Sequence, residues 1–76
     1  MKLHEKIYYY RKKAGLSQDA LAEKLGVSRQ AISKWETAES VPETAKLAAL
    51  ASALGISVDW LLSEEEPEGE TNGARE

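Results

Sequence analysis

The stretch from Ser28 to Glu36, SRQAISKWE, combines a helix-capping serine with side chains that can pair with the edges of bases. An arginine can donate two hydrogen bonds to O6 and N7 of guanine, and a glutamine can pair with N6 and N7 of adenine. If Ile32 and Trp35 point into a core, helical periodicity places the polar residues of this stretch on the opposite face. The outward set is Arg29, Gln30, Ser33, Lys34 and Thr37. Taken alone, a set of polar residues on a helix more often forms a solvated polar face, and base recognition is the alternative that the surrounding motif has to support.

The net charge of the chain argues at first sight against a polyanionic partner. Thirteen acidic side chains face ten basic ones, for a formal net charge of −3. The acids are concentrated at the end, since residues 64–76 carry six glutamates and one arginine (−5), whereas residues 1–63 carry nine bases and seven acids (+2). The end segment has no apolar residue larger than alanine, so it cannot repay its ordering entropy. We therefore expect a mildly basic folded domain at 1–63 and a disordered acidic tail at 64–76.

The composition excludes several functional classes. The 76 residues, 42% of them hydrophobic, suffice for one small core. Cysteine is absent and His4 is the sole histidine, so we expect no metal site. No glycine-rich phosphate loop and no nucleophile with a matched base is present, so we expect neither an enzyme nor a cofactor. No apolar run approaches the roughly 20 residues that cross a bilayer, so we expect a cytoplasmic protein with no membrane contact.

The spacing of apolar residues, punctuated by glycine and proline, predicts an all-α chain of five helices. In the first helix, Leu3, Ile7, Tyr10 and Ala14 form one apolar stripe. The five helices are expected at residues 2–14, 18–25, 29–36, 44–54 and 58–62.

Three of these helix starts share one sequence pattern. An apolar residue comes directly before a capping serine, and a second apolar residue lies five positions after the first one. This is the pattern of a hydrophobic staple around an N-cap. Each occurrence comes where a glycine ends the preceding element, so the three together are stronger evidence for helix starts than any single match. The three are Leu16-Ser17 with Leu21, Val27-Ser28 with Ile32, and Ile56-Ser57 with Leu61.

Residues 18–35 have the spacing of a helix-turn-helix. Ala22 is small where a second helix would cross the first, and Gly26 can adopt a positive φ in the turn. A turn of only a few residues between two short helices fixes a steep crossing. The apolar contacts would come from Leu21, Leu25, Val27, Ile32 and Trp35.

The chain resembles the phage-repressor-like helix-turn-helix family, also called the XRE or Cro/C1 type, over about residues 3–63. The resemblance implies a compact five-helix bundle. It also implies a sequence-specific transcriptional regulator, a repressor, that binds double-stranded DNA as a homodimer on a near-palindromic operator. The matching residues are Ile7, Arg11, Gly15-Leu16-Ser17-Gln18, Leu21-Ala22, Leu25-Gly26-Val27-Ser28, Ile32-Ser33-Lys34-Trp35-Glu36, Pro42, Leu54-Gly55-Ile56-Ser57 and Leu61-Leu62.

The resemblance assigns roles to the polar residues of this region. The helix at 29–36 would enter the major groove, where Arg29 and Gln30 read bases and Ser33 and Lys34 contact bases or nearby phosphates. Gln18, at a helix start, would touch a phosphate and brace Gln30. Ser28 and Thr37 are further candidates for phosphate or bracing contacts.

Two other predictions concern charges. Arg11 and Glu36 occupy positions that form a largely buried, structural ion pair in many family members. Lys12, Lys13, Lys34 and Lys46 are the remaining candidates for phosphate attraction, although an isolated surface lysine more often serves only as a solubilising charge.

The loop after residue 36 departs from the family pattern, which usually has a glycine there. Ala38 would pay a cost in a left-handed conformation, and Glu39 places negative charge where a phosphate would sit. We expect modest DNA affinity that falls steeply with salt. The acidic loop and tail leave an alternative open, in which the same fold serves as a protein-interaction module of antitoxin-like or adaptor type.

Overall fold

The computed structural model describes residues 1–66, so the predicted tail lies outside the described residues from position 67 onward. The expected all-α bundle of five helices is confirmed, and no strand occurs within residues 1–66. The first helix is one residue shorter at each end than predicted, and the other four have the predicted bounds. In chain order the helices are α1 (Leu3–Lys13), α2 (Gln18–Leu25), α3 (Arg29–Glu36), α4 (Thr44–Leu54) and α5 (Val58–Leu62).

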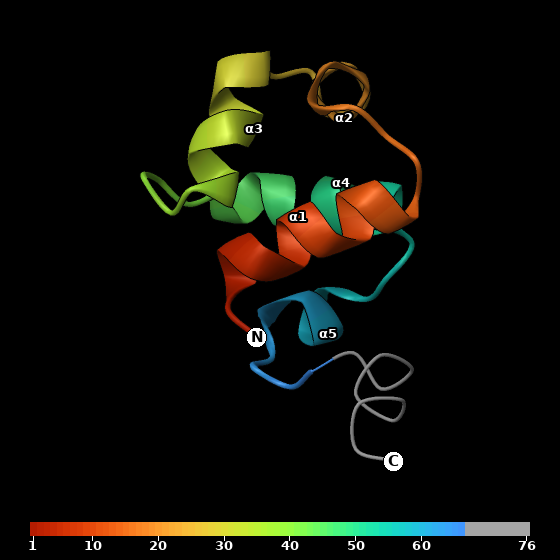
Figure 1. Ribbon diagram of the computed structural model, residues 1–76, viewed down its shortest axis with the longest axis vertical. Coiled ribbons are helices and arrows are strands. Elements are labelled where there is room, and N and C mark those ends of the chain that lie inside the picture. Colours follow the sequence, from red (N-terminus) through yellow and green to blue (C-terminus); the bar gives the residue numbers. More distant parts are fainter. Residues whose placement is uncertain (67–76) are drawn as a thin grey trace.

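Each helix contributes one apolar side chain with 0% exposure to a shared core. Because every element has a buried residue there, the short helices stabilise one another through packing, where none would be stable alone. Figure 1 shows α2 and α3 at one end of the molecule, α5 at the other, and α1 and α4 between them. The five residues are Ile7, Leu21, Ile32, Leu50 and Leu61.

The three predicted serine caps are confirmed. In each, the serine Oγ accepts a hydrogen bond from the backbone N–H three residues later, which satisfies one of the free donors at the helix start. The apolar partner that each staple predicts is fully buried. The donors lie 3.0–3.1 Å away: Ala20 to Ser17, Ala31 to Ser28, and Trp60 to Ser57.

The buried face of α1 differs from the predicted stripe. Ala14, expected to face inward, is exposed, because α1 ends at Lys13 and Ala14 is the C-cap. Ile7 is buried, and Leu3 and Tyr10 pack against the core, as the stripe predicts, but the buried residues of α1 also include Lys6 and Arg11. Two charged side chains thus share the interior with one isoleucine, and each needs polar partners there.

Lys6 is 0% exposed and ties α1 to the end of α5. Its ammonium group donates to the carbonyl oxygens of Trp60 (2.5 Å) and Ser63 (2.8 Å) and to Ser63 Oγ (2.7 Å). It also lies 4.0 Å from the centre of the Trp60 ring, a cation–π contact. Burial lowers the pKa of Lys6, and the nearby carboxylates of Glu65 and Glu66 oppose this shift.

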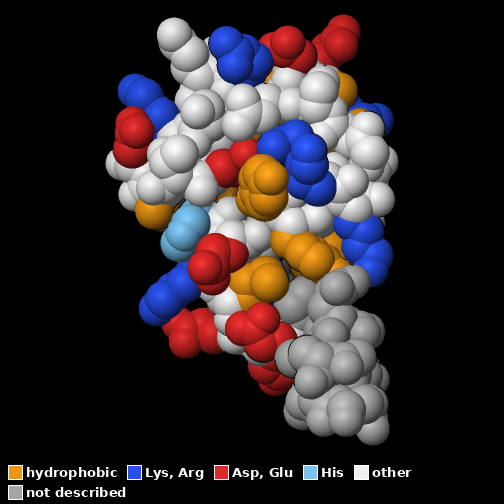
Figure 2. Space-filling view, viewed as in Figure 1, with side chains coloured by type: hydrophobic (Ala, Val, Ile, Leu, Met, Phe, Trp, Pro, Cys, Tyr) orange, Lys and Arg blue, Asp and Glu red, His pale blue; other side chains and the backbone are white. Residues whose placement is uncertain are grey.

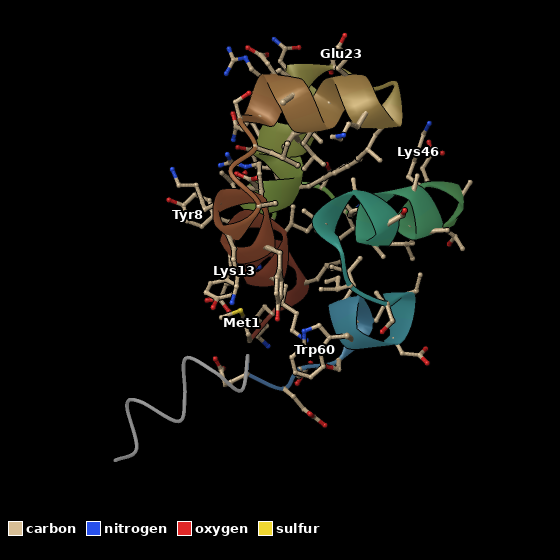
Figure 3. All side chains as sticks on the ribbon, turned by 90° about the vertical axis from the view of Figure 1, so that its right-hand side faces the viewer. Met1, Tyr8, Lys13, Glu23, Lys46 and Trp60 are labelled. Carbon is tan, nitrogen blue, oxygen red and sulfur yellow. The ribbon has the colours of Figure 1, made fainter. Side chains whose placement is uncertain are left out.

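Trp60 packs beside the core at the junction of α1 and α5, where Figure 3 places its ring. Its indole Nε1 donates to the hydroxyl of Tyr10 at 2.6 Å. This bond satisfies the polar atom of a half-buried indole. The lower end of the bundle is therefore held by specific polar contacts as well as by Leu61.

Candidate nucleic-acid interface

The turn between α2 and α3 holds these helices at a steep angle. Gly26 follows the end of α2 with a φ of 70°, a left-handed conformation that favours glycine. The next N–H, from Val27, donates to the carbonyl of Ala22 at 3.0 Å. Ala22 is 4% exposed. In Figure 1, α2 is seen nearly end-on while α3 runs in the plane of the view, and α3 starts at the end of the molecule where α2 lies.

The side chains of α3 divide into two faces, as the periodicity predicts. Ile32 (0% exposed) and Trp35 (7% exposed) face the core. Ser33 is half-buried between the two faces. The exposed residues of the predicted reading face are Arg29, Gln30, Lys34 and Thr37.

Glu36, at the end of α3, joins the first three helices. Its carboxylate pairs with Arg11, whose Nε lies 2.5 Å from Oε2 and whose Nη2 lies 3.1 Å from Oε1. Arg11 also donates to the carbonyl of Leu16 at 2.8 Å, and the two charged side chains are only 8% and 5% exposed. The structure thus brings together the two residues that the family resemblance pairs.

Gln18 joins the same group from α2. Its Nε2 donates to Oε1 of Glu36 at 3.0 Å. The family resemblance implies that Gln18 braces Gln30, but in this structure the amide is held by Glu36 instead. The hydrogen bond fixes the orientation of the Gln18 amide at the start of α2, where the helix dipole favours an anion.

An open hollow of about 530 Å³ lies where α1 ends and α2 and α3 begin. Asp19 and Arg29 lie on its rim, and the Arg29 Nε is 3.4 Å from the Asp19 Oδ1. Asp19 was not among the predicted site residues; the helix-turn-helix crossing, which brings two first turns together, is the signal that could have found it. The polar lining consists of Arg11, Lys12, Ser17, Gln18, Asp19 and Arg29.

The arrangement of α2, the short turn and α3 is that of a helix-turn-helix, and comparison with known protein families gives the same description. A family model described as helix-turn-helix matches residues 7–61, most of the chain. The chain belongs to this helix-turn-helix family.

Two curated relatives of this helix-turn-helix protein are longer than the region they share with it. It is 41% identical over 66 residues to the HTH-type transcriptional activator BcrR of Enterococcus faecalis, covering 87% of this chain and 32% of the activator. It is 47% identical over 58 residues to Repressor protein C2 of Salmonella phage P22, covering 76% of this chain and 27% of the repressor. The chain therefore spans less than a third of either relative.

One similar solved structure is the P22 c2 repressor crystallised with the synthetic operator 9T. The match has a TM-score of 0.80 and 42% sequence identity, and it covers 86% of this chain and 98% of that one. The whole five-helix arrangement is thus shared, and the likeness is not confined to the helix pair.

Ser28 and Thr37 of the helix-turn-helix protein both serve as helix caps. Ser28 Oγ accepts from the N–H of Ala31, and Thr37 Oγ1 donates to the carbonyl of Lys34 at 3.3 Å. The capping bond of Ser28 leaves its hydroxyl proton available to a phosphate, because a hydroxyl both donates and accepts. A capping role and the predicted phosphate contact are compatible for Ser28.

The lysines expected to attract phosphates divide into two groups. Lys12, Lys13 and Lys34 are exposed. Lys46 is half-buried, and its Nζ donates to the carbonyl of Leu25 at 3.2 Å, which satisfies an acceptor at the end of α2. The structure thus engages Lys46 in holding α4 against α2.

The loop after α3 adopts the strained conformation that its sequence suggests. Ala38 has a φ of 68°, the single positive value at a non-glycine residue within residues 1–66. Glu39 is exposed, and its N–H donates to the carbonyl of Lys34 at 2.9 Å. The loop closes the end of α3 with a left-handed turn that alanine occupies at a cost.

Two features are absent from the part of the chain that the structure describes. Residues 1–66 contain no group of three or more His, Asp or Glu side chains placed to hold a metal ion. Across the same range, no helix combines the length and the apolar character needed to traverse a bilayer.

Proposed function

We propose that this chain is a transcriptional repressor that binds double-stranded DNA in the cytoplasm with α3 in the major groove, and that its activity is binding rather than catalysis. The observation that carries the proposal is the exposed edge of α3, where Arg29, Gln30 and Lys34 stand opposite the buried Ile32 and Trp35. The relative that is a phage repressor and the similar repressor–operator structure support the same assignment.

The roles follow from the chemistry of each side chain. Arg29 and Gln30, in the first turn of α3, read guanine and adenine edges. Ser33 and Lys34 contact a base or a neighbouring phosphate. Gln18, held by Glu36, and the start of α2 receive a phosphate.

Two copies acting together would place two α3 helices on one operator. One short helix reads only a few base pairs, so a single copy has little affinity or selectivity. A two-fold dimer predicts a near-palindromic site with half-sites about 34 Å apart, one turn of the double helix. Sedimentation of the protein with and without a duplex that it binds tests the dimer, and a single copy on the DNA at high protein concentration would exclude it.

The specificity is tested by selecting bound duplexes from a random pool at low salt and sequencing them. We expect enrichment of a near-palindrome whose half-site contains guanine and adenine. Gln30→Ala should remove preference at one position of each half-site, whereas Lys2→Gln, an exposed lysine before α1, should leave the selected motif unchanged. A wild-type pool with no enriched motif would exclude sequence-specific binding and favour the protein-interaction alternative.

A further inference from the structure

Asp19 and Arg29 form an ion pair across the helix-turn-helix. Asp19 is the second residue of α2 and Arg29 is the first of α3. The carboxylate lies 3.4 Å from the Arg29 Nε, and the two side chains are 78% and 59% exposed. An ion pair this exposed contributes little to stability, because water screens it and two flexible side chains must be ordered. The ion pair acts instead on the orientation of the Arg29 side chain.

The contact engages one particular side of the guanidinium group. The atom of Arg29 closest to Asp19 is Nε, and in a planar guanidinium the edge formed by the two terminal nitrogens lies on a different side from Nε. A guanidinium presents its donors in a rigid planar fork, so fixing the Nε side also fixes the direction of the terminal edge. Two N–H groups on that edge match O6 and N7 of guanine.

We propose that Asp19 is a positioning residue that holds Arg29 for guanine readout; this rests on the proposed DNA binding of α3. Without Asp19, the flexible arginine can turn to a phosphate, a contact that carries no sequence information. The carboxylate also weakens, without abolishing, the attraction of a phosphate to the start of α2, because Asp19 and Gln18 line the same hollow. Asp19 therefore lowers affinity for DNA of any sequence and raises selectivity at one base pair.

The pair becomes more important when α3 enters a groove. Water then leaves both side chains, and the interaction between their charges strengthens as the local dielectric falls. An arginine that contacts both a carboxylate and a guanine has its donors satisfied on two sides. The selectivity that Asp19 confers thus appears only in the complex, and the free protein should tolerate its replacement.

The test compares Asp19→Asn with Glu23→Gln, which makes the same charge change on the same helix. Glu23 is exposed on α2 and points away from the rest of the molecule in Figure 3. Both variants and the wild type are used in duplex selection, and their affinity for a fixed non-operator duplex is measured. In Asp19→Asn we expect preference for guanine at one position per half-site to fall roughly fivefold or more, with other positions unchanged. Affinity for the non-operator duplex should rise in this variant.

Arg29→Ala supplies the second half of the test. In this background, Asp19→Asn should change no base preference, because the side chain that Asp19 positions is gone. Circular dichroism of every variant checks that the helices remain folded. The inference is overturned if Asp19→Asn selects the wild-type motif with unchanged preferences, or if Glu23→Gln loses the same guanine preference. A wild type that selects no motif would instead overturn the proposed DNA reading itself.

Discussion

Glu36 joins three helices through its contacts with Arg11 and Gln18, and both members of the ion pair are buried. Removing the carboxylate leaves the Arg11 guanidinium unpaired in a low-dielectric site, which costs far more than the pair contributes to stability. We expect Glu36→Ala to lower the free energy of unfolding by about 3 kcal/mol in urea titrations. Glu39→Ala, at an exposed site, should change it by less than about 0.5 kcal/mol. Equal effects of the two variants would refute a structural role for the pair.

At Ala38 we predict a substitution that stabilises the fold. Its φ of 68° strains any residue with a Cβ. Relief of this strain is worth about 1–2 kcal/mol, and the extra freedom of glycine in the unfolded chain offsets roughly half of it. Ala38→Gly should therefore raise the free energy of unfolding by about 0.5–1 kcal/mol. Ala49→Gly, at an exposed position inside α4, should lower it by about 1 kcal/mol. Two changes of the same sign would contradict the argument.

The reading face of α3 was predictable because it depends on period alone. With Ile32 and Trp35 buried, the positions of Arg29, Gln30 and Lys34 follow from 3.6 residues per turn. The residues that contact the polar side chains at the α2–α3 crossing could not be predicted from helical periodicity. Asp19 faces Arg29, and Gln18 binds Glu36 rather than Gln30, because small rotations of side chains at the helix crossing decide such contacts.

Helix boundaries were predictable for a local reason. A serine cap, its staple and a glycine at the preceding end are all set by residues within a few positions. The predicted bounds of the serine-capped helices α2, α3 and α5 are confirmed. Of the two helices without a capping serine, α4 also has its predicted bounds, and α1 differs by one residue at each end. The burial of Lys6 depends on Trp60 and Ser63, more than fifty positions away, so no local pattern indicates it.

Lys6 is the polar link between α1 and α5. Lys6→Met keeps the apolar stem but removes the ammonium donor. The carbonyl oxygens of Trp60 and Ser63, at the end of α5, then lose the hydrogen bonds that they accept from Lys6. We expect the free energy of unfolding to fall by about 2 kcal/mol, and the α5 amides to lose hydrogen-exchange protection before those of α2 and α3. Lys13→Met, at an exposed position, should leave both measurements nearly unchanged. Uniform loss of protection across all helices would contradict a local link.

Acidic and basic side chains both occur at each end of the molecule. In Figure 2 several acidic side chains gather at the lower end, near α5, and acidic side chains also lie among the lysines and arginines of the upper part. The net charge of −3 includes the −5 of residues 64–76, so it describes the surface around α2 and α3 poorly. Local charges should control binding to DNA, because charges farther away than about 10 Å are largely screened at 0.1 M salt.

A pair of charge reversals separates local from net charge. If Lys12 and Lys34 of each copy contact phosphates, a dimer neutralises about four, and the logarithm of affinity should fall with the logarithm of salt at a slope of about −4. Glu39→Lys, beside α3, adds a cation per copy and should steepen the slope by about 2. Asp59→Lys makes the same change in net charge on α5, at the opposite end, and should leave the slope unchanged. Equal steepening in both variants would mean that net charge governs the affinity and that the loop after α3 lies away from the phosphates.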